Sequence, residues 1–210
     1  MADYDAISEA LQKGKAPEVK EMVQKAVDEG APAGDILEKG LIAGMGIIGA
    51  KFKANEVYVP EVLIAARAMH AGMDVLEPEI VKAGIEPKGS VIIGTVKGDL
   101  HDIGKNLVMM MFKGAGFKVV DVGIDVTAEK FVEAAKADNI KLIGCSALLT
   151  TTMPQMKEVV DAVKAAGIDT KVLIGGAPVT QSYCDEIGAD GYAPDASSAV
   201  DVAKNLLGVN

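Results

Sequence analysis

The sequence has no tryptophan, a single arginine and few aromatic residues, and these shortages exclude several classes of protein. Aromatic side chains make up 4% of the 210 residues, which leaves few rings to stack on nucleic-acid bases. Arg67 is the only arginine, and the formal net charge of −9 would repel a phosphate backbone. We therefore expect no nucleic-acid partner.

Cysteines and long apolar runs are also scarce. Cys145 and Cys184 lack the spacing of a metal or redox motif and are too few for a disulfide scaffold, so we expect buried structural thiols. The longest uncharged apolar stretch, Gly40 to Ala50, is far shorter than the roughly 20 residues of a membrane-spanning helix. The acidic N-terminus lacks the basic and apolar regions of a secretory signal. A cytoplasmic protein without a membrane partner is expected.

Hydrophobic residues form half of the chain, and their spacing in the first part is helical. Up to about residue 83 they recur every three or four positions, which is typical of amphipathic helices. We expect four helices, at 5–13, 16–29, 33–52 and 59–76, that pack as an antiparallel bundle. The glycines between Gly40 and Gly49 are expected to allow close packing of these helices.

A turn-rich segment at 83–90 precedes an alternation of strands and helices. Short apolar, β-branched runs predict strands at 91–96, 118–122, 142–146 and 172–175, with a last short strand near 191–192. Helices are expected at 103–114, 128–137, 153–166, 181–187 and 196–207. The predicted fold class is α/β: a four-helix bundle cap (residues 1–86), then a five-stranded, parallel, doubly wound, flavodoxin-like domain (residues 87–210).

The loop after the first predicted strand carries residues that suit metal binding. Asp99 and His101 are two residues apart, with Gly98 and Gly104 on either side. A metal-binding histidine commonly donates its second ring N–H to a carboxylate, which orients the ring. Taken alone, the pattern is equally explained by a helix cap at Asp102 beside an incidental histidine.

Two further groups follow other strands at the carboxyl edge of the sheet, where ligands of such folds bind. A run rich in hydroxyl groups, Ser146 to Thr152, follows the third strand, and the glycine pair Gly175 and Gly176 follows the fourth. Glycines remove side chains from the strand edge, so an elongated group can lie against the backbone. A threonine cluster alone is more typical of a helix cap, but the three groups together favour a ligand site.

Together these residues resemble the signature of cobalamin-binding domains: Asp-x-His-x-x-Gly, then Ser-x-Leu, then Gly-Gly. Here they read Asp99-Leu100-His101-Asp102-Ile103-Gly104, Ser146-Ala147-Leu148 and Gly175-Gly176. Residues 44–69 are similar to the helical cap that precedes this domain in methionine synthase and in corrinoid proteins. The chain thus resembles the corrinoid subunit of a methylamine, methanol or methoxy-aromatic methyltransferase system.

The resemblance implies a cofactor and a role for each motif. Cobalamin, as methylcobalamin or another corrinoid, would be bound with His101 as the lower axial ligand of cobalt. Asp99 would bond the other ring nitrogen of His101, and Thr152 would extend that relay. The remaining residues implied to contact the cofactor belong to the loop, to the channel for its nucleotide tail and to the cap: Asp102, Ile103, Gly104, Ser146, Leu148, Thr150, Gly175, Gly176, Ala177, Phe52, Val59 and Val62.

The implied function is that of a methyl carrier that is not catalytic by itself. Co(I) would accept a methyl group from a substrate-specific methyltransferase, and methyl-Co(III) would pass it to a second methyltransferase with tetrahydrofolate or another acceptor. A reductive activator is a further implied partner. The alternatives are a cobalamin storage module, a cobalamin-responsive regulator, which would need a basic DNA-binding segment, and a mutase subunit, which generally lacks the helical cap. The roles of Glu56 and His70 stay open.

Overall fold

The computed structural model describes residues 2–137 and 140–209, which divide into two compact units. The described residues up to Pro87, together with Gly114–Gly116, form a helical unit. The others form an α/β unit. Each unit has its own hydrophobic core, as expected for a chain of this length.

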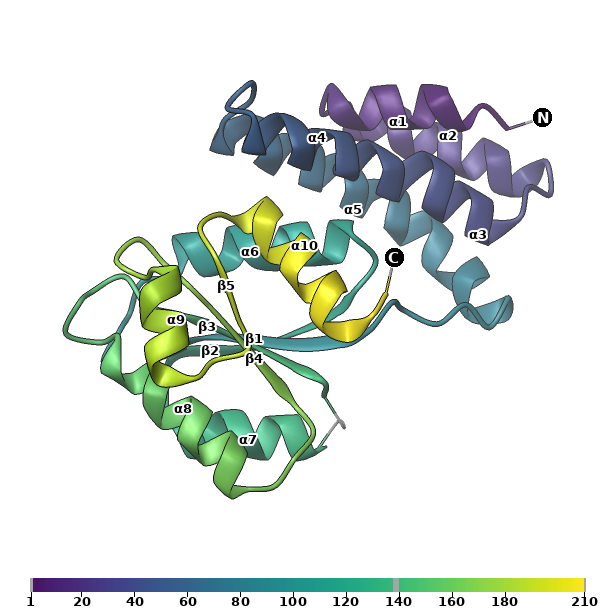
Figure 1. Ribbon diagram of the computed structural model, residues 1–210. Coiled ribbons are helices and arrows are strands. Elements are labelled where there is room, and N and C mark those ends of the chain that lie inside the picture. Colours follow the sequence, from purple (N-terminus) through teal and green to yellow (C-terminus); the bar gives the residue numbers. More distant parts are fainter. Residues whose placement is uncertain (1, 138–139, 210) are drawn as a thin grey trace. The chain divides into compact units, whose positions relative to one another are not determined.

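The helical unit is a bundle in which α1 contacts α2 and α4, and α2 contacts α5 (Figure 1). Apolar residues at helical spacing are buried between these elements, for example Leu11 of α1 and Val19 of α2. The bundle confirms the helical architecture predicted for this part of the chain. Its elements are α1 (Tyr4–Gln12), α2 (Ala16–Asp28), α3 (Ala33–Asp35), the π-helix η1 (Ile36–Ile42), α4 (Ala43–Lys53) and α5 (Val59–Lys82).

Glycines bring the third helical segment, α3 to α4, close to α1. A Cβ atom at Gly40 would lie 3.1 Å from Ile7, and one at Gly44 would lie 3.2 Å from the carbonyl oxygen of Ser8. Gly46 has no such neighbour within 4 Å. Close helix packing is therefore confirmed at Gly40 and Gly44. At Gly46 helix packing does not require a glycine.

The last helix of the bundle is longer than the sequence pattern predicts. We expected it to end at Leu76, but α5 continues to Lys82 and includes Pro78. Proline cannot donate the hydrogen bond that the carbonyl of residue 74 would otherwise accept. Asp74 is exposed, so water can satisfy that carbonyl, and the helix continues for one more turn.

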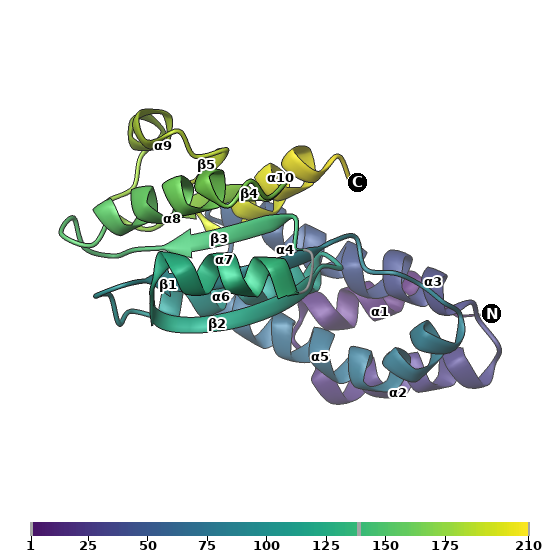
Figure 2. The same ribbon diagram turned by 90° about the horizontal axis from the view of Figure 1, so that it is seen from below.

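Five parallel strands form one sheet within the described part of the α/β unit, in the order β2-β1-β3-β4-β5 (Figure 2). The strands are β1 (Ser90–Val96), β2 (Lys118–Val126), β3 (Leu142–Ser146), β4 (Lys171–Gly175) and β5 (Gly191–Ala193). The chain moves from β1 to β2 on one side and later to β3 on the other. The strand order therefore switches beside β1, and the carboxyl ends of β1 and β3 are neighbours at that point.

Helices cover both faces of the sheet, which confirms the doubly wound α/β class (Figure 1). Helices α7 and α8 share a buried core with one face, and Cys145 and Cys184 are buried in it as expected. Burial raises the pKa of both thiols, so neither is a reactive thiolate. The helices are α6 (Ile103–Gly114), α7 (Ala128–Ala137), α8 (Pro154–Ala165), α9 (Gln181–Ile187) and α10 (Ala196–Leu207).

The second strand is also longer than expected. We predicted that it would end at Val122, but β2 continues to Val126. A glycine at this position is typical of a turn in a sequence, but in the structure Gly123, with φ +96°, takes part in an irregular pairing with β1.

Among the described helices, none combines the length and the apolar character needed to cross a bilayer.

Two glycines of α4 provide a matched test of the helix packing. Gly46→Ala should stabilise the bundle by about 0.5–1 kcal/mol, because alanine restricts the unfolded chain more than glycine does. Gly44→Ala should gain less or destabilise, because its Cβ meets the backbone of α1. Urea unfolding followed by circular dichroism measures both, and equal stabilisation by the two substitutions would contradict the packing described here.

Candidate functional site

The candidate site lies in the loop between β1 and α6, at the carboxyl edge of the sheet. Three of the residues predicted for it, Asp99, His101 and Thr152, come together in the structure. Asp99 is fully buried although it is charged, and its amide bonds the Val96 carbonyl at the end of β1 at 3.1 Å. A buried carboxylate is stable only when it is well hydrogen-bonded, so its partners define the site.

Each of the two oxygens of the Asp99 carboxylate accepts two hydrogen bonds. Oδ1 accepts the backbone N–H of His101 at 3.1 Å and lies 2.7 Å from the ring Nδ1 of His101. Oδ2 accepts the backbone N–H of Leu148 at 2.8 Å and the hydroxyl of Thr152 at 2.7 Å. One buried charge therefore joins the loop after β1 to the segment after β3.

These contacts fix the charge state of Asp99. Burial by itself raises the pKa of the Asp99 carboxyl, but hydrogen bonds from the Leu148 amide, the Thr152 hydroxyl and His101 outweigh it and hold that pKa well below its usual range. An ionised carboxylate can only accept hydrogen bonds, so the proton between Asp99 and His101 belongs to Nδ1 of the histidine. In the neutral tautomer of such a histidine, Nε2 is the nitrogen that carries the lone pair.

The ring of His101 is held at its base and open at its tip. Its side chain is 51% exposed, and its backbone carbonyl accepts the hydroxyl of the fully buried Thr95 at 2.8 Å. A neutral imidazole whose Nδ1–H is bonded to a carboxylate is the usual form of a metal-binding histidine. No group of three or more histidine, cysteine, aspartate or glutamate side chains that could hold a metal ion occurs within the described residues.

Exposed apolar side chains occur next to His101 in the sequence and in the segment after β3 whose Leu148 amide bonds Asp99. Leu100 is 67% exposed and Ile103 is 81% exposed, values that are unusual for large aliphatic residues. Exposing such side chains to water is unfavourable, so their exposure favours a site for a broad, largely apolar ligand that would cover them. The exposed aliphatic residues of this part of the α/β unit are Leu100, Ile103, Ile124, Leu148 and Leu149.

The second and third predicted groups lie at the same edge of the sheet. Thr95, Ser146 and Gly175 are register partners at the ends of β1, β3 and β4. Gly176 has φ +138°, and a Cβ there would overlap the carbonyl oxygen of Ala147. Gly176 is therefore required by the close approach of the backbone after β3 and after β4.

The other predicted residues of the α/β unit lie at the surface of the same region. Thr150 and Ala177 are exposed, and Asp102 accepts a hydrogen bond from the side chain of Asn106 at 3.1 Å. A Cβ at Gly104 would meet no atom within 4 Å. Packing within the described chain therefore gives no reason for a glycine at position 104.

The predicted residues of the helical unit differ in exposure. Phe52 and Val59 are half-buried, whereas Val62 is fully buried in the core of the bundle. Tyr58, between them in sequence, is 64% exposed. Sequence reasoning passed over Tyr58, although an aromatic residue beside a proline-initiated helix in a chain with few aromatic residues was a usable signal.

Sequence reasoning also missed three residues around the histidine loop. Thr95 bonds the His101 carbonyl, as described above. Asp125 accepts the backbone N–H of Gly98 at 2.7 Å, and the nearly buried Lys105 contacts both carboxylate oxygens of Asp121 at 2.7 Å. Thr95 and Lys105 flank the loop in sequence, but their hydrogen-bond partners, and the approach of Asp125 from β2, depend on the folded structure.

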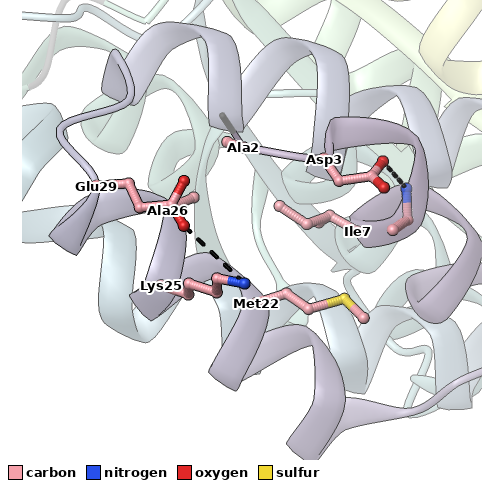
Figure 3. Close-up of a pocket in the computed structure, with 8 residues that line it drawn as sticks. Ala2, Asp3, Ile7, Met22, Lys25, Ala26 and Glu29 are labelled. Atoms are coloured by element: carbon pink, nitrogen blue, oxygen red, sulfur yellow. Dashed lines mark hydrogen bonds and ion pairs between the residues drawn. The ribbon is translucent and has the colours of Figure 1, made fainter.

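A separate cavity of about 250 Å³ lies in the helical unit between α1 and α2 (Figure 3). Its polar groups are already paired along their own helices: Asp3 accepts the Ala6 amide at 3.0 Å, and Lys25 lies 4.0 Å from Glu29. The remaining lining is mainly aliphatic or small, so we assign no ligand to it. The lining residues are Ala2, Asp3, Ala6, Ile7, Met22, Lys25, Ala26 and Glu29.

Family models match both parts of the chain. A model described as a B12 binding domain matches residues 89–201, and a second model with the same description matches residues 4–77. The first match includes the Asp99–His101 loop and the carboxyl edge of the sheet. The fold and the site therefore define a two-part cobalamin-binding protein.

Relatives and a solved structure narrow this class. A corrinoid protein of Desulfitobacterium hafniense is 44% identical, with 99% of each chain covered. A dimethylamine corrinoid protein of Methanosarcina acetivorans is 46% identical, with 96% of this chain and 94% of the relative covered. In a crystal structure of the methanol:cobalamin methyltransferase complex of Methanosarcina barkeri, one chain is 30% identical with a TM-score of 0.85 over 97% of this chain and 79% of that chain. This chain belongs to the corrinoid proteins of methyltransferase systems.

The buried carboxylate predicts a specific response to acid. The Asp99 pKa is lower in the folded protein than in the unfolded chain, so its contribution to stability is complete above the unfolded value of about 4. It is lost as the pH falls through the lower folded value. Urea unfolding measured from pH 7 down to pH 2 should therefore show no loss from this carboxyl above about pH 4 and an increasing loss of stability below it in the wild type.

Asp99→Asn should destabilise the protein by about 3 kcal/mol at pH 7, because it removes a charged acceptor from four donors. It should also flatten the pH dependence. Asp169→Asn, at a residue 87% exposed, is the control and should behave as the wild type does. An unchanged acid response in Asp99→Asn would show that another group is responsible.

Proposed function

We propose that this chain is a methyl carrier, which accepts a methyl group from a substrate-specific methyltransferase and delivers it to a second methyltransferase. The observation that carries the proposal is the half-exposed imidazole of His101, whose Nδ1 is held by a buried, ionised Asp99. The names of the relatives support a corrinoid carrier, and the solved methyltransferase complex supports a methyltransferase partner. The second methyltransferase and a reductive activator are part of the proposal.

The residues around His101 fit a corrinoid. His101 would supply an imidazole nitrogen to the cobalt, and Asp99 with Thr152 would keep the imidazole in the required tautomer. Exposed Leu100 and Ile103 would be covered by the broad apolar face of the macrocycle. The bound corrinoid supplies cobalt, a metal that can hold and release a methyl group.

The carboxyl edge of the sheet suits the nucleotide tail of the cofactor. Ser146 at the end of β3 and Thr150 after it carry hydroxyl groups, and Gly175 at the end of β4 and Ala177 after it are small residues. A Cβ at Gly104 would meet no atom of the chain within 4 Å, so packing does not require a glycine there, and the close approach of a ligand would account for it. These features support a site for an elongated group on this edge.

In the helical unit, we assign the shielding of the methyl group to apolar side chains that are accessible. Phe52 and Val59 are half-buried and Tyr58 is exposed, so all three have surface to offer a ligand. Val62 is fully buried, and a direct contact with a ligand would require the helices around it to move. Such side chains exclude water from a reactive centre without competing as ligands.

The histidine assignment has a matched control within the chain. His101→Ala should change the absorption spectrum of the protein reconstituted with hydroxocobalamin, because the axial nitrogen is lost. His70→Ala removes the other histidine, which is exposed on α5, and should leave that spectrum unchanged. Identical spectra for wild type and His101→Ala would exclude His101 as the axial ligand.

A transfer assay separates a carrier from a storage protein. Reduced, reconstituted protein is mixed with a dimethylamine- or methanol-specific methyltransferase and its substrate, and methylation of the corrinoid is followed spectroscopically. A second methyltransferase with its acceptor should then remove the methyl group. Corrinoid that stays bound but is not methylated by any of the tested methyltransferases would favour storage.

A further inference from the structure

The end of β2 contains two more residues than its pairing with β1 requires. Ile93 pairs with Asp121, Gly94 with Gly123, and Val96 with Val126. Three steps along β1 therefore correspond to five steps along β2, with an irregularity on each side of Gly94. Surplus residues of this kind bend a strand away from its partner and redirect side chains. We call residues 121–126 the bulged end of β2.

The bulged end reaches the loop that carries His101. The Asp125 carboxylate accepts the backbone N–H of Gly98 at 2.7 Å. The backbone N–H of Asp125 donates to the carbonyl oxygen of Asp99 at 3.1 Å. Asp125 therefore contacts both the turn before Asp99 and Asp99 itself, from a strand on the opposite side of β1 from β3.

The backbone of Asp125 is in an unfavourable conformation. Its φ is +53°, in the left-handed region that residues other than glycine rarely adopt. Its side chain is exposed, so packing in the core does not explain this conformation. In this conformation Asp125 makes two hydrogen bonds to the histidine loop, and these offset its cost.

The opposite side of the bulged end is fixed by α6. Lys105, which is nearly fully buried, contacts both oxygens of Asp121 at 2.7 Å, and Asp121 also accepts the Gly123 amide at 2.9 Å. Lys105 follows His101 in the chain, whereas Gly98 precedes it. The histidine loop is therefore tied to the same strand end on both sides of His101.

We propose that Asp125 is a positioning residue for His101: it holds the Gly98–Asp99 turn so that the imidazole is presented in one orientation. This inference rests on the proposed role of His101 as an axial ligand. Asp125 does not touch His101 itself and acts through the backbone of the loop. A preorganised loop loses less conformational freedom when a ligand binds.

Three substitutions separate the side chain of Asp125 from its backbone. Asp125→Ala removes the acceptor and keeps the strained φ. Asp125→Gly removes the acceptor and relieves the strain. Asp125→Asn keeps a carbonyl acceptor and tolerates a left-handed backbone. Asp169→Ala is the control, because Asp169 is an exposed aspartate of the same unit that pairs with Lys141 at 3.1 Å.

The first measurement uses the full-length protein before reconstitution. Amide exchange of Gly98, followed by NMR, should be about tenfold faster in Asp125→Ala and Asp125→Gly, because a hydrogen bond to a charged acceptor is lost. It should change less than threefold in Asp125→Asn. The control should match the wild type. Unchanged exchange in Asp125→Gly would overturn the proposal.

The second measurement uses the same proteins reconstituted with hydroxocobalamin. The fraction of cobalt with an axial histidine, read from the absorption spectrum against wild type and His101→Ala, should fall at least threefold in Asp125→Ala and Asp125→Gly. Asp125→Asn should restore it. Faster Gly98 exchange with unchanged coordination would overturn the positioning role.

If His101→Ala itself has the wild-type spectrum, the axial assignment fails and the positioning role fails with it. The Gly98 exchange rates would then still establish whether Asp125 holds the turn, so the two failures are distinguishable.

Discussion

The buried carboxylate of Asp99 is the constraint on which the rest of the site depends. A charge in that position requires compensation, and its four donors come from both sides of the interface between the ends of β1 and β3. The strand order β2-β1-β3 makes this possible, because it places those two ends next to each other. The same contacts bond Nδ1 of His101, while about half of its side chain stays exposed. The fully hydrogen-bonded carboxylate of Asp99 thus stabilises the α/β unit and orients the ring of His101.

The parts of the fold that depend on local pattern were predictable from the sequence. Strand β3 and helices α6, α7, α9 and α10 begin and end where expected, because short β-branched runs and amphipathic periods are read within one segment. The failures have tertiary causes. The end of β2 depends on a bulged pairing with β1, and α5 continues through Pro78 at a place where Asp74, one turn earlier, is exposed. Local sequence does not record either condition.

The candidate site divides in the same way. Asp99, His101 and Thr152 belong to spaced motifs, and their contacts are those expected of a histidine oriented by a carboxylate with a hydroxyl behind it. The accessible residues of the helical unit were less predictable, because the burial of Val62 and the exposure of Tyr58 depend on which face of α5 packs into the bundle. An apolar residue in a helix can serve the core or a ligand, and sequence periodicity does not distinguish the two.

Departures from regular backbone geometry in the α/β unit include a group around the histidine loop. Gly98 and Gly123 have positive φ, Asp125 adopts a left-handed conformation, and the pairing of β1 with β2 shifts twice nearby. The left-handed conformation of Asp125 costs conformational free energy, and a strand that only completed a sheet would need neither it nor the two shifts in pairing. Because they converge on a loop whose own side chains are partly solvent-exposed, core packing does not account for them. The irregular end of β2 is better understood as the support of that loop. The residues that leave the regular pairing with β1 include Asp125, which makes the hydrogen bonds to Gly98 and Asp99.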